Sequence, residues 1–189
     1  MAGAGLDFQP LSSGLLEPWL AFFDRVAFAD NPGWAGCYCH FPLADHDGKP
    51  WESRGAAENR TAAISLVQAG RLRGWVALEG GAVVGWCHAG PREAFTILDP
   101  PVDPPAGAGA AIVCFLVAPA WRRRGVGSGL LTAACAGLTA QGFAWVEAWP
   151  RREAATAAAH YHGPLSMYHR AGFQTLSEDR GVLTLRRGL

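Results

Sequence analysis

The chain has no excess of either charge and almost no lysine. Its 189 residues carry 16 basic and 16 acidic side chains, so the formal net charge is zero, and Lys49 is the single lysine. Without a broad basic surface, neither nucleic acid nor an anionic membrane is expected as a partner. Any anion site must therefore be local, built where arginines cluster.

Signals for export and for membrane insertion are also missing. Residues 1–5 contain neither a basic region nor an apolar core, so no signal peptide is expected. Two uncharged stretches, 104–121 and 125–146, have the composition of membrane spans. The first contains three prolines, and Gln141-Gly142 interrupts the second. Buried strands and helices explain both stretches better than a lipid-spanning helix.

Cysteines are few and odd in number, and most lie in apolar segments without a secretion signal. We therefore expect reduced thiols and a cytoplasmic location rather than a disulfide framework. Cys37-Tyr-Cys39-His40, with His46 nearby, has the residue types of a zinc site, but this spacing is not that of a familiar zinc finger. We expect these side chains to pack or to line a substrate pocket, with no metal bound.

The pattern of apolar residues predicts a single domain over residues 1–189, because half of the side chains are hydrophobic. Spacing and turn residues in the first half predict a strand, a helix, a loop, a helix and a hairpin at 6–11, 15–26, 30–50, 51–69 and 75–88. In the second half, a proline-glycine loop at 99–109 comes before a predicted strand at 111–117, a helix at 130–140 and a strand at 143–149. A short helix at 165–171 and two strands at 173–176 and 182–185 are predicted to follow. Residues 111–149 thus form a right-handed βαβ unit.

The loop of this βαβ unit has the residues of a phosphate site, Val-Ala-Pro-Ala-Trp-Arg-Arg-Arg-Gly-Val-Gly-Ser-Gly over 117–129. Small residues let a ligand approach the backbone, and free amides at a helix N-terminus attract phosphate. A dinucleotide-binding turn would need a third glycine where Leu130 stands, with glycines directly after the strand. A P-loop would need Gly-Lys-Ser/Thr, which the sequence lacks.

Two motifs in the second half resemble the GNAT superfamily of N-acetyltransferases. Arg122-Arg-Arg-Gly-Val-Gly127 resembles its acetyl-CoA signature, [Gln/Arg]-x-x-Gly-x-[Gly/Ala], and Tyr168-His-Arg-Ala-Gly-Phe173 resembles its Tyr-x-x-x-Gly-Phe element. Trp34-x-x-Cys-x-Cys39 is similar to a segment of an uncharacterised branch of that superfamily. Where many members have Asn and Ala before the tyrosine, this chain has Tyr161 and Pro164.

The resemblance implies an α/β (α+β) fold, with a mixed, mostly antiparallel central sheet flanked by helices. It also implies that acetyl-CoA is the co-substrate. Its pantetheine would lie along the backbone of Phe115, Leu116 and Val117. Its pyrophosphate would lie over the loop residues Arg122, Arg123, Arg124, Gly125, Val126, Gly127 and Ser128.

The same resemblance makes Tyr168 the acid that protonates the leaving thiolate. Glu147 is the predicted base, because it shares a strand face with Trp145 and Trp149, where an apolar setting would make a carboxylate more basic. The alternative is a carboxylate at the strand end that pairs with an arginine or faces solvent. The histidines His160 and His162 are alternative proton relays. A nucleophilic cysteine would most naturally be Cys114 on the central strand, but direct transfer needs no covalent intermediate.

The predicted function is acetyl transfer from acetyl-CoA to a primary amine of a small molecule or peptide. Aromatic residues and the 91–108 loop would form the acceptor pocket, with candidates Trp34, Tyr38, Trp51 and Trp86. The alternative is a non-catalytic domain that senses acyl-CoA or binds a partner. The acceptor, the acyl chain length and the oligomeric state, with a homodimer as one option, stay open.

Overall fold

One seven-stranded sheet runs through the part of the chain that the computed structural model describes, residues 5–154, 156 and 158–189. Residues 1–4, part of the segment examined for a signal peptide, lie outside it. The strands in sheet order are β1 (Asp7–Pro10), β2 (Gly74–Glu79), β3 (Ala82–Pro91), β4 (Gly109–Val117), β5 (Trp145–Ala148), β7 (Val182–Gly188) and β6 (Gln174–Asp179). Only β4 and β5 pair in parallel. The predicted mixed, mostly antiparallel sheet is confirmed.

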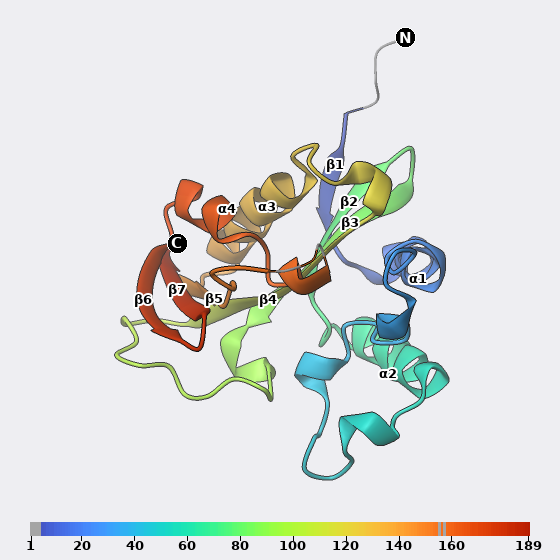
Figure 1. Cartoon of the computed structure of the whole chain (residues 1–189), viewed down its shortest axis with the longest axis horizontal. Coiled ribbons are helices and arrows are strands. Elements are labelled where there is room, and N and C mark those ends of the chain that lie inside the picture. Colours follow the sequence, from blue (N-terminus) through green and yellow to red (C-terminus); the bar gives the residue numbers. More distant parts are fainter. Residues whose placement is uncertain (1–4, 155, 157) are drawn as a thin grey trace.

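Four helices cover the two faces of this sheet (Figure 1). The first pair, α1 (Leu16–Arg25) and α2 (Ala56–Gln68), packs on one face, and the second pair, α3 (Val126–Ala140) and α4 (Leu165–Arg170), packs on the other. Helix α1 forms because its apolar side chains recur at helical spacing, and its Trp19 meets Trp86 of β3 edge to face at 5.6 Å. The predicted stripe of α3 is fully buried.

The prediction for the second helix is wrong over its first residues. Trp51–Ser53 forms a separate 3₁₀ turn, and α2 begins only at Ala56. Arg54 is the reason, because its side chain turns back to donate to the carbonyl of Asp45 at 2.8 Å while its backbone is extended. Gly55 is extended as well and caps α2.

The hairpin and the βαβ unit create the opening at which a ligand can bind. Gly80 and Gly81, both with positive φ, make the tight turn between β2 and β3. Strand β4 pairs with β5 only from Gly109 to Ile112. From there to Val117 it keeps only its β3 neighbour, so one edge of β4 is open.

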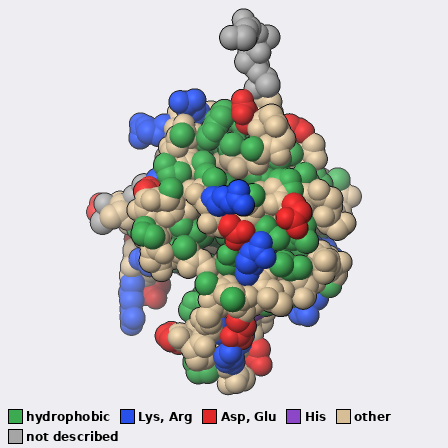
Figure 2. Space-filling model, turned by 90° about the vertical axis from the view of Figure 1, so that its right-hand side faces the viewer, with side chains coloured by type: hydrophobic (Ala, Val, Ile, Leu, Met, Phe, Trp, Pro, Cys, Tyr) green, Lys and Arg blue, Asp and Glu red, His purple; other side chains and the backbone are tan. Residues whose placement is uncertain are grey.

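The surface agrees with the balanced charge of the sequence. Figure 2 shows Lys or Arg and Asp or Glu side chains interspersed among hydrophobic ones on the face that it presents. In the described part of the chain, no helix is long and apolar enough to cross a membrane.

Candidate active site

A groove of about 750 Å³ lies against the open edge of β4. On the β3 side, the Ala118 amide donates to the Val84 carbonyl at 2.9 Å. Because neighbouring residues of a strand direct their backbone groups to opposite edges, Phe115 and Val117 direct theirs to the open edge. Phe115, Leu116 and Val117 all line the groove, so the predicted pantetheine segment does border a cavity.

The arginine-glycine loop forms the end of this groove. Gly125 caps α3 with a φ of +82°, a conformation that favours glycine, and the amides of the first turn of α3 follow it. A Cβ at Gly127 would meet only the Met167 sulfur, at 3.4 Å, so this glycine leaves space at the groove. Gly129 is needed for packing rather than for the groove, because a Cβ there would clash with the Phe8 ring.

The three arginines of the loop differ in what they contact. Arg122 forms an ion pair with Asp30, with Nη2 3.0 Å from Oδ1, and its Nε donates to the Val117 carbonyl at 3.1 Å. This contact lowers the pKa of Asp30. Arg123, with a φ of +59°, lines the groove together with Arg122, Gly125, Val126, Gly127 and Ser128. Arg124 does not border the groove and lies over the Trp121 ring, 5.4 Å from its centroid.

The segment 158–163 also lines the groove, and it accepts hydrogen bonds from two groups that the predicted reaction uses. The Phe115 amide donates to the Tyr161 carbonyl at 2.5 Å. The Tyr168 hydroxyl donates to the next carbonyl, that of His162, at 2.7 Å. Tyr168 is fully buried, burial raises the pKa of its hydroxyl well above the usual value, and its ring borders neither cavity.

A second cavity of about 600 Å³ adjoins the groove. The two share Phe28, Trp34, Leu116 and Tyr161, and the Trp34 and Tyr161 rings meet edge to face at 5.4 Å. Of the aromatic residues predicted for an acceptor pocket, Trp34 and Trp51 line this cavity, as does Ile97 from the 91–108 loop. Tyr38 and Trp86 instead lie in the core between α1 and the sheet.

The apolar setting expected for Glu147 is wrong. Its carboxylate is almost fully buried between two guanidinium groups, accepting from Arg92 Nε at 2.7 Å and from Arg186 Nη2 at 2.7 Å. The two arginines lie over the rings of Trp149 and Trp145. They also donate to the carbonyls of the loop residues Asp99, Val102 and Asp103. Glu147 therefore ties this loop to the sheet, and it borders neither cavity.

The family of the chain follows from comparison with known proteins. The model of the acetyltransferase (GNAT) family matches residues 34–173, which include the arginine-glycine loop and most of the residues that line the groove and the second cavity. The chain belongs to the GNAT acetyltransferase family. A search of curated proteins gave no match.

Solved structures of acetyltransferases share the fold over most or all of their length. The GNAT domain of S. lividans PAT is 18% identical with a TM-score of 0.58, over 96% of this chain and 89% of that one. PaiA N-acetyltransferase from Thermoplasma acidophilum, in complex with coenzyme A, is 15% identical with a TM-score of 0.56, over 98% and 100%. An acetyltransferase from Thermus thermophilus is 19% identical with a TM-score of 0.56, over 100% of both chains.

The remaining candidates of this GNAT chain are distributed between the two cavities. His160 borders the groove, whereas His162 and Cys114 border the second cavity. Burial lowers the pKa of His162 to about 4, so its ring is neutral at pH 7, and its Nδ1 has no hydrogen-bond partner in the described part of the chain.

The cysteine-histidine segment uses its side chains within the protein. Cys37 and Cys39 line the second cavity, and the Cys39 sulfur accepts from Trp86 Nε1 at 3.2 Å. His40 Nδ1 lies 3.1 Å from Asn59 Oδ1, and His46 Nε2 lies 2.8 Å from the Phe41 carbonyl. The described residues contain no group of three ligands that could hold a metal ion.

Two features of the site were missed at the level of sequence. The ion pair of Asp30 with Arg122 joins residues 92 positions apart, and no local pattern indicates it. The cover formed by segment 158–163 had one signal, because Tyr161 and Pro164 replace the family's Asn and Ala. Pro164 caps α4, so the chain reaches β4 just before that helix begins.

Proposed function

We propose that the chain is an acetyl-CoA-dependent N-acetyltransferase that moves acetyl directly to a primary amine of a small molecule or peptide. The observation that carries this proposal is the position of the α3 N-terminus at the end of a groove along the open edge of β4. Backbone amides there, with Arg123 beside them, suit a pyrophosphate. The CoA complex of the structurally similar PaiA N-acetyltransferase supports the same ligand.

In this proposal, residues 122–128 hold the pyrophosphate and the backbone of Phe115, Leu116 and Val117 holds the pantetheine. Arg122 adds positive charge to the loop, and its ion pair with Asp30 also holds the loop in position. Arg124 contributes charge from outside the groove, since its guanidinium is stacked on Trp121. The Phe115 amide becomes available to a ligand only when the Tyr161 carbonyl leaves it.

The chemistry requires two proton transfers. As the amine nitrogen bonds to the acetyl carbon and the carbon–sulfur bond breaks, the nitrogen loses a proton and the leaving sulfur gains one. Tyr168 stays the proposed acid, and its hydroxyl can serve the sulfur only once it stops donating to the His162 carbonyl. Glu147 stays a predicted base, but its two arginines engage the carboxylate away from the groove. His162 is the better placed proton acceptor, because it is neutral and borders the second cavity.

The test combines binding with turnover. Calorimetric titration with acetyl-CoA is expected to show one site, and a broad amine panel followed by release of free thiol is expected to yield at least one acceptor. Tight binding of acyl-CoA without turnover of any amine would favour the alternative, an acyl-CoA sensor or partner domain. The extent of the domain over residues 1–189 and the cytoplasmic location stay predictions.

A further inference from the structure

Exposed hydrophobic side chains gather at the mouth of the second cavity. Among the described residues, six large hydrophobic side chains are exposed, and three of them line this cavity: Trp34, Phe41 and Ile97. They come from two loops far apart in the chain, Trp34 and Phe41 from 30–50 and Ile97 from 91–108, so no single amphipathic element explains their exposure. Grouped exposed apolar side chains mark a surface that binds something apolar.

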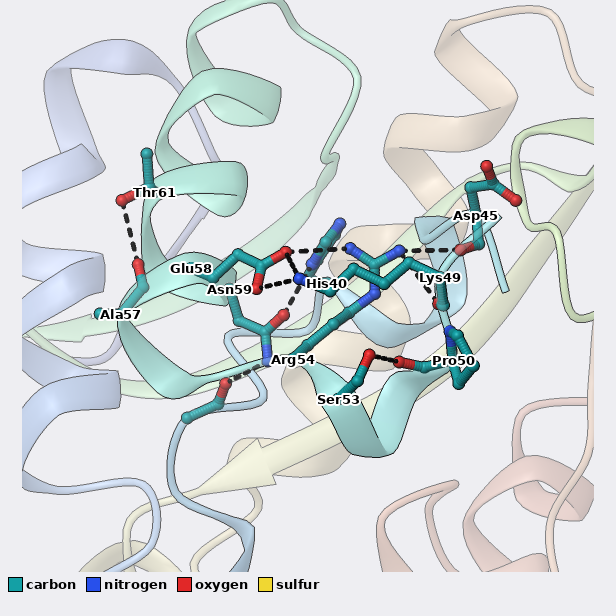
Figure 3. A network of polar contacts seen from close by, with 11 residues as sticks. His40, Asp45, Lys49, Pro50, Ser53, Arg54, Ala57, Glu58, Asn59 and Thr61 are labelled. Atoms are coloured by element: carbon teal, nitrogen blue, oxygen red, sulfur yellow. Dashed lines mark hydrogen bonds and ion pairs between the residues drawn. The ribbon is translucent and has the colours of Figure 1, made fainter. Parts of the chain in front are cut away.

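Two polar side chains in the wall of this cavity, Asn59 and Arg54, form hydrogen bonds within the protein. Asn59 donates to the Gly36 carbonyl at 3.1 Å, and its Oδ1 lies 3.1 Å from His40 Nδ1. Arg54 donates to the Asp45 carbonyl at 2.8 Å, as Figure 3 shows. This network holds the wall together and engages the Asn59 amide and one guanidinium nitrogen of Arg54. Among the described residues, Arg54 Nε and His162 Nδ1 are the buried polar atoms of this wall that have no hydrogen-bond partner.

We infer that the second cavity takes a primary amine carried on an apolar, ring-bearing body, as the acceptor for the acetyl transfer. This inference rests on the proposed function. A flat ring can pack against the Trp51 and Phe41 rings, which meet edge to face at 5.0 Å. Glu52 is the single carboxylate among the described residues that line this cavity, and it is exposed, so the cavity offers little to a ligand with several ammonium groups.

Hydrophilic amines fit this cavity poorly. A sugar amine or polyamine carries more hydroxyl or ammonium groups than the few unpartnered polar atoms of this wall can bind, so the remaining groups would lose their water without gaining a protein partner. A group buried in this way lowers affinity by roughly 10- to 100-fold. The volume of about 600 Å³ is in the range of small-molecule pockets.

The cavity opens where acetyl transfer would take place. Trp34, Leu116 and Tyr161 border both the cavity and the groove, and Leu116 belongs to the β4 segment proposed to hold pantetheine. An amine whose body lies in the cavity therefore directs its nitrogen toward the β4 edge.

The experiment compares three amines on the full chain with acetyl-CoA. We expect kcat/KM for 2-phenylethylamine to exceed that for glucosamine or spermidine by about 100-fold. Ile97→Asp places a charge at the cavity mouth on an exposed side chain, so the fold is retained, and should lower kcat/KM for 2-phenylethylamine by about tenfold. Leu176→Asp, an equally exposed apolar position on β6, is the matched control and should change nothing.

Binding of 2-phenylethylamine to the chain saturated with CoA, measured by ligand-observed NMR, separates this inference from the proposed function. Binding that Ile97→Asp weakens, without turnover, supports the cavity assignment and overturns the proposed catalysis. Glucosamine or spermidine used as well as 2-phenylethylamine, or no binding of 2-phenylethylamine at all, overturns the inference. Failure to bind acetyl-CoA overturns the proposed function alone.

Discussion

The backbone amide of Phe115 donates to the carbonyl of Tyr161 at 2.5 Å, across the open edge of β4. The next carbonyl, His162, receives the Tyr168 hydroxyl. Segment 158–163 therefore makes the hydrogen bonds that pantetheine and a leaving thiolate would make in the proposed reaction. In that reaction the segment would compete with the ligand for the same two groups.

Weakening this segment should strengthen binding of acetyl-CoA. The Tyr161 ring packs on Trp34 and on His162, at 5.4 and 4.0 Å, so Tyr161→Ala removes what holds the segment in place. We expect acetyl-CoA to bind severalfold more tightly by calorimetry, because less free energy is needed to displace the segment. Tyr161→Phe keeps the ring and should bind like the wild type.

Adenosine 3′,5′-bisphosphate, which lacks pantetheine, is the control ligand for this prediction. Its affinity should be the same in Tyr161→Ala and in the wild type. Weaker binding of acetyl-CoA by Tyr161→Ala would show that the segment contacts the ligand instead of competing with it.

Substitutions at the loop glycines should distinguish residues needed for acetyl-CoA binding from residues needed for stability of the fold. Gly125→Asp or Gly127→Asp places a carboxylate where the pyrophosphate would meet amides, and acetyl-CoA affinity should fall severely. Gly127→Asp is the cleaner variant, because Gly125 also needs its positive φ. Gly129→Ala should lower the melting temperature through its clash with Phe8. Unchanged acetyl-CoA affinity of a folded Gly127→Asp protein would remove the assignment of the loop.

Glu147→Gln tests whether this carboxylate is a base or a tether. The change leaves two buried guanidinium groups without their anion, and breaking a buried ion pair costs roughly 3–5 kcal/mol of stability. We expect a large loss of stability in urea unfolding and faster hydrogen exchange in residues 99–103. Glu178→Gln breaks an exposed pair with Arg152 and should leave stability nearly unchanged. A fully stable Glu147→Gln protein whose pH–rate profile is shifted would restore the role of base.

Tyr168→Phe removes one hydroxyl and keeps the ring in its packing with Phe115 and Phe173. If the hydroxyl protonates the leaving thiolate, kcat should fall by roughly 100-fold, with a smaller effect on the KM for the amine. Acetyl-CoA affinity should stay close to that of the wild type. Wild-type turnover on the best amine would assign the hydroxyl solely to holding the His162 carbonyl.

Stability should depend on pH through a buried histidine in β3. His88 lies between the Trp86 and Phe95 rings, neither ring nitrogen has a partner in the described part of the chain, and burial lowers its pKa to about 3. In the unfolded chain His88 binds a proton near pH 6.5, whereas in the folded chain it does so only near pH 3. The free energy of unfolding therefore keeps the contribution of neutral His88 above pH 6.5 and loses it as the pH falls from 6.5 toward 3. The loss is about 1.4 kcal/mol per pH unit.

His88→Leu removes both the titrating group and the unpaired nitrogens at similar volume. We expect the variant to be more stable than the wild type at pH 7, and its urea midpoint to change less between pH 7 and pH 5. The lowered pKa of His162 leaves some pH dependence in both proteins. An unchanged slope in His88→Leu would show that other groups carry the effect.

Short-range patterns by themselves determined much of this protein. The stripe of α1, the Gly80-Gly81 turn and the apolar strand β4 depend on side chains a few positions apart, and the structure has all three. The arginine-glycine motif predicted the loop at the start of α3 for the same reason, because a helix cap is a local structure.

Only the tertiary structure decided which of these residues meet a partner from another segment. Glu147 has its two tryptophan neighbours, as the strand pattern implies, yet arginines from distant segments fill the space between them. Arg122 forms an ion pair with Asp30, 92 positions away in the sequence, and the Tyr161 carbonyl accepts from the Phe115 amide, 46 positions away. Such pairs depend on how strands and loops pack together, and that packing is set by the whole core rather than by the residues beside each side chain.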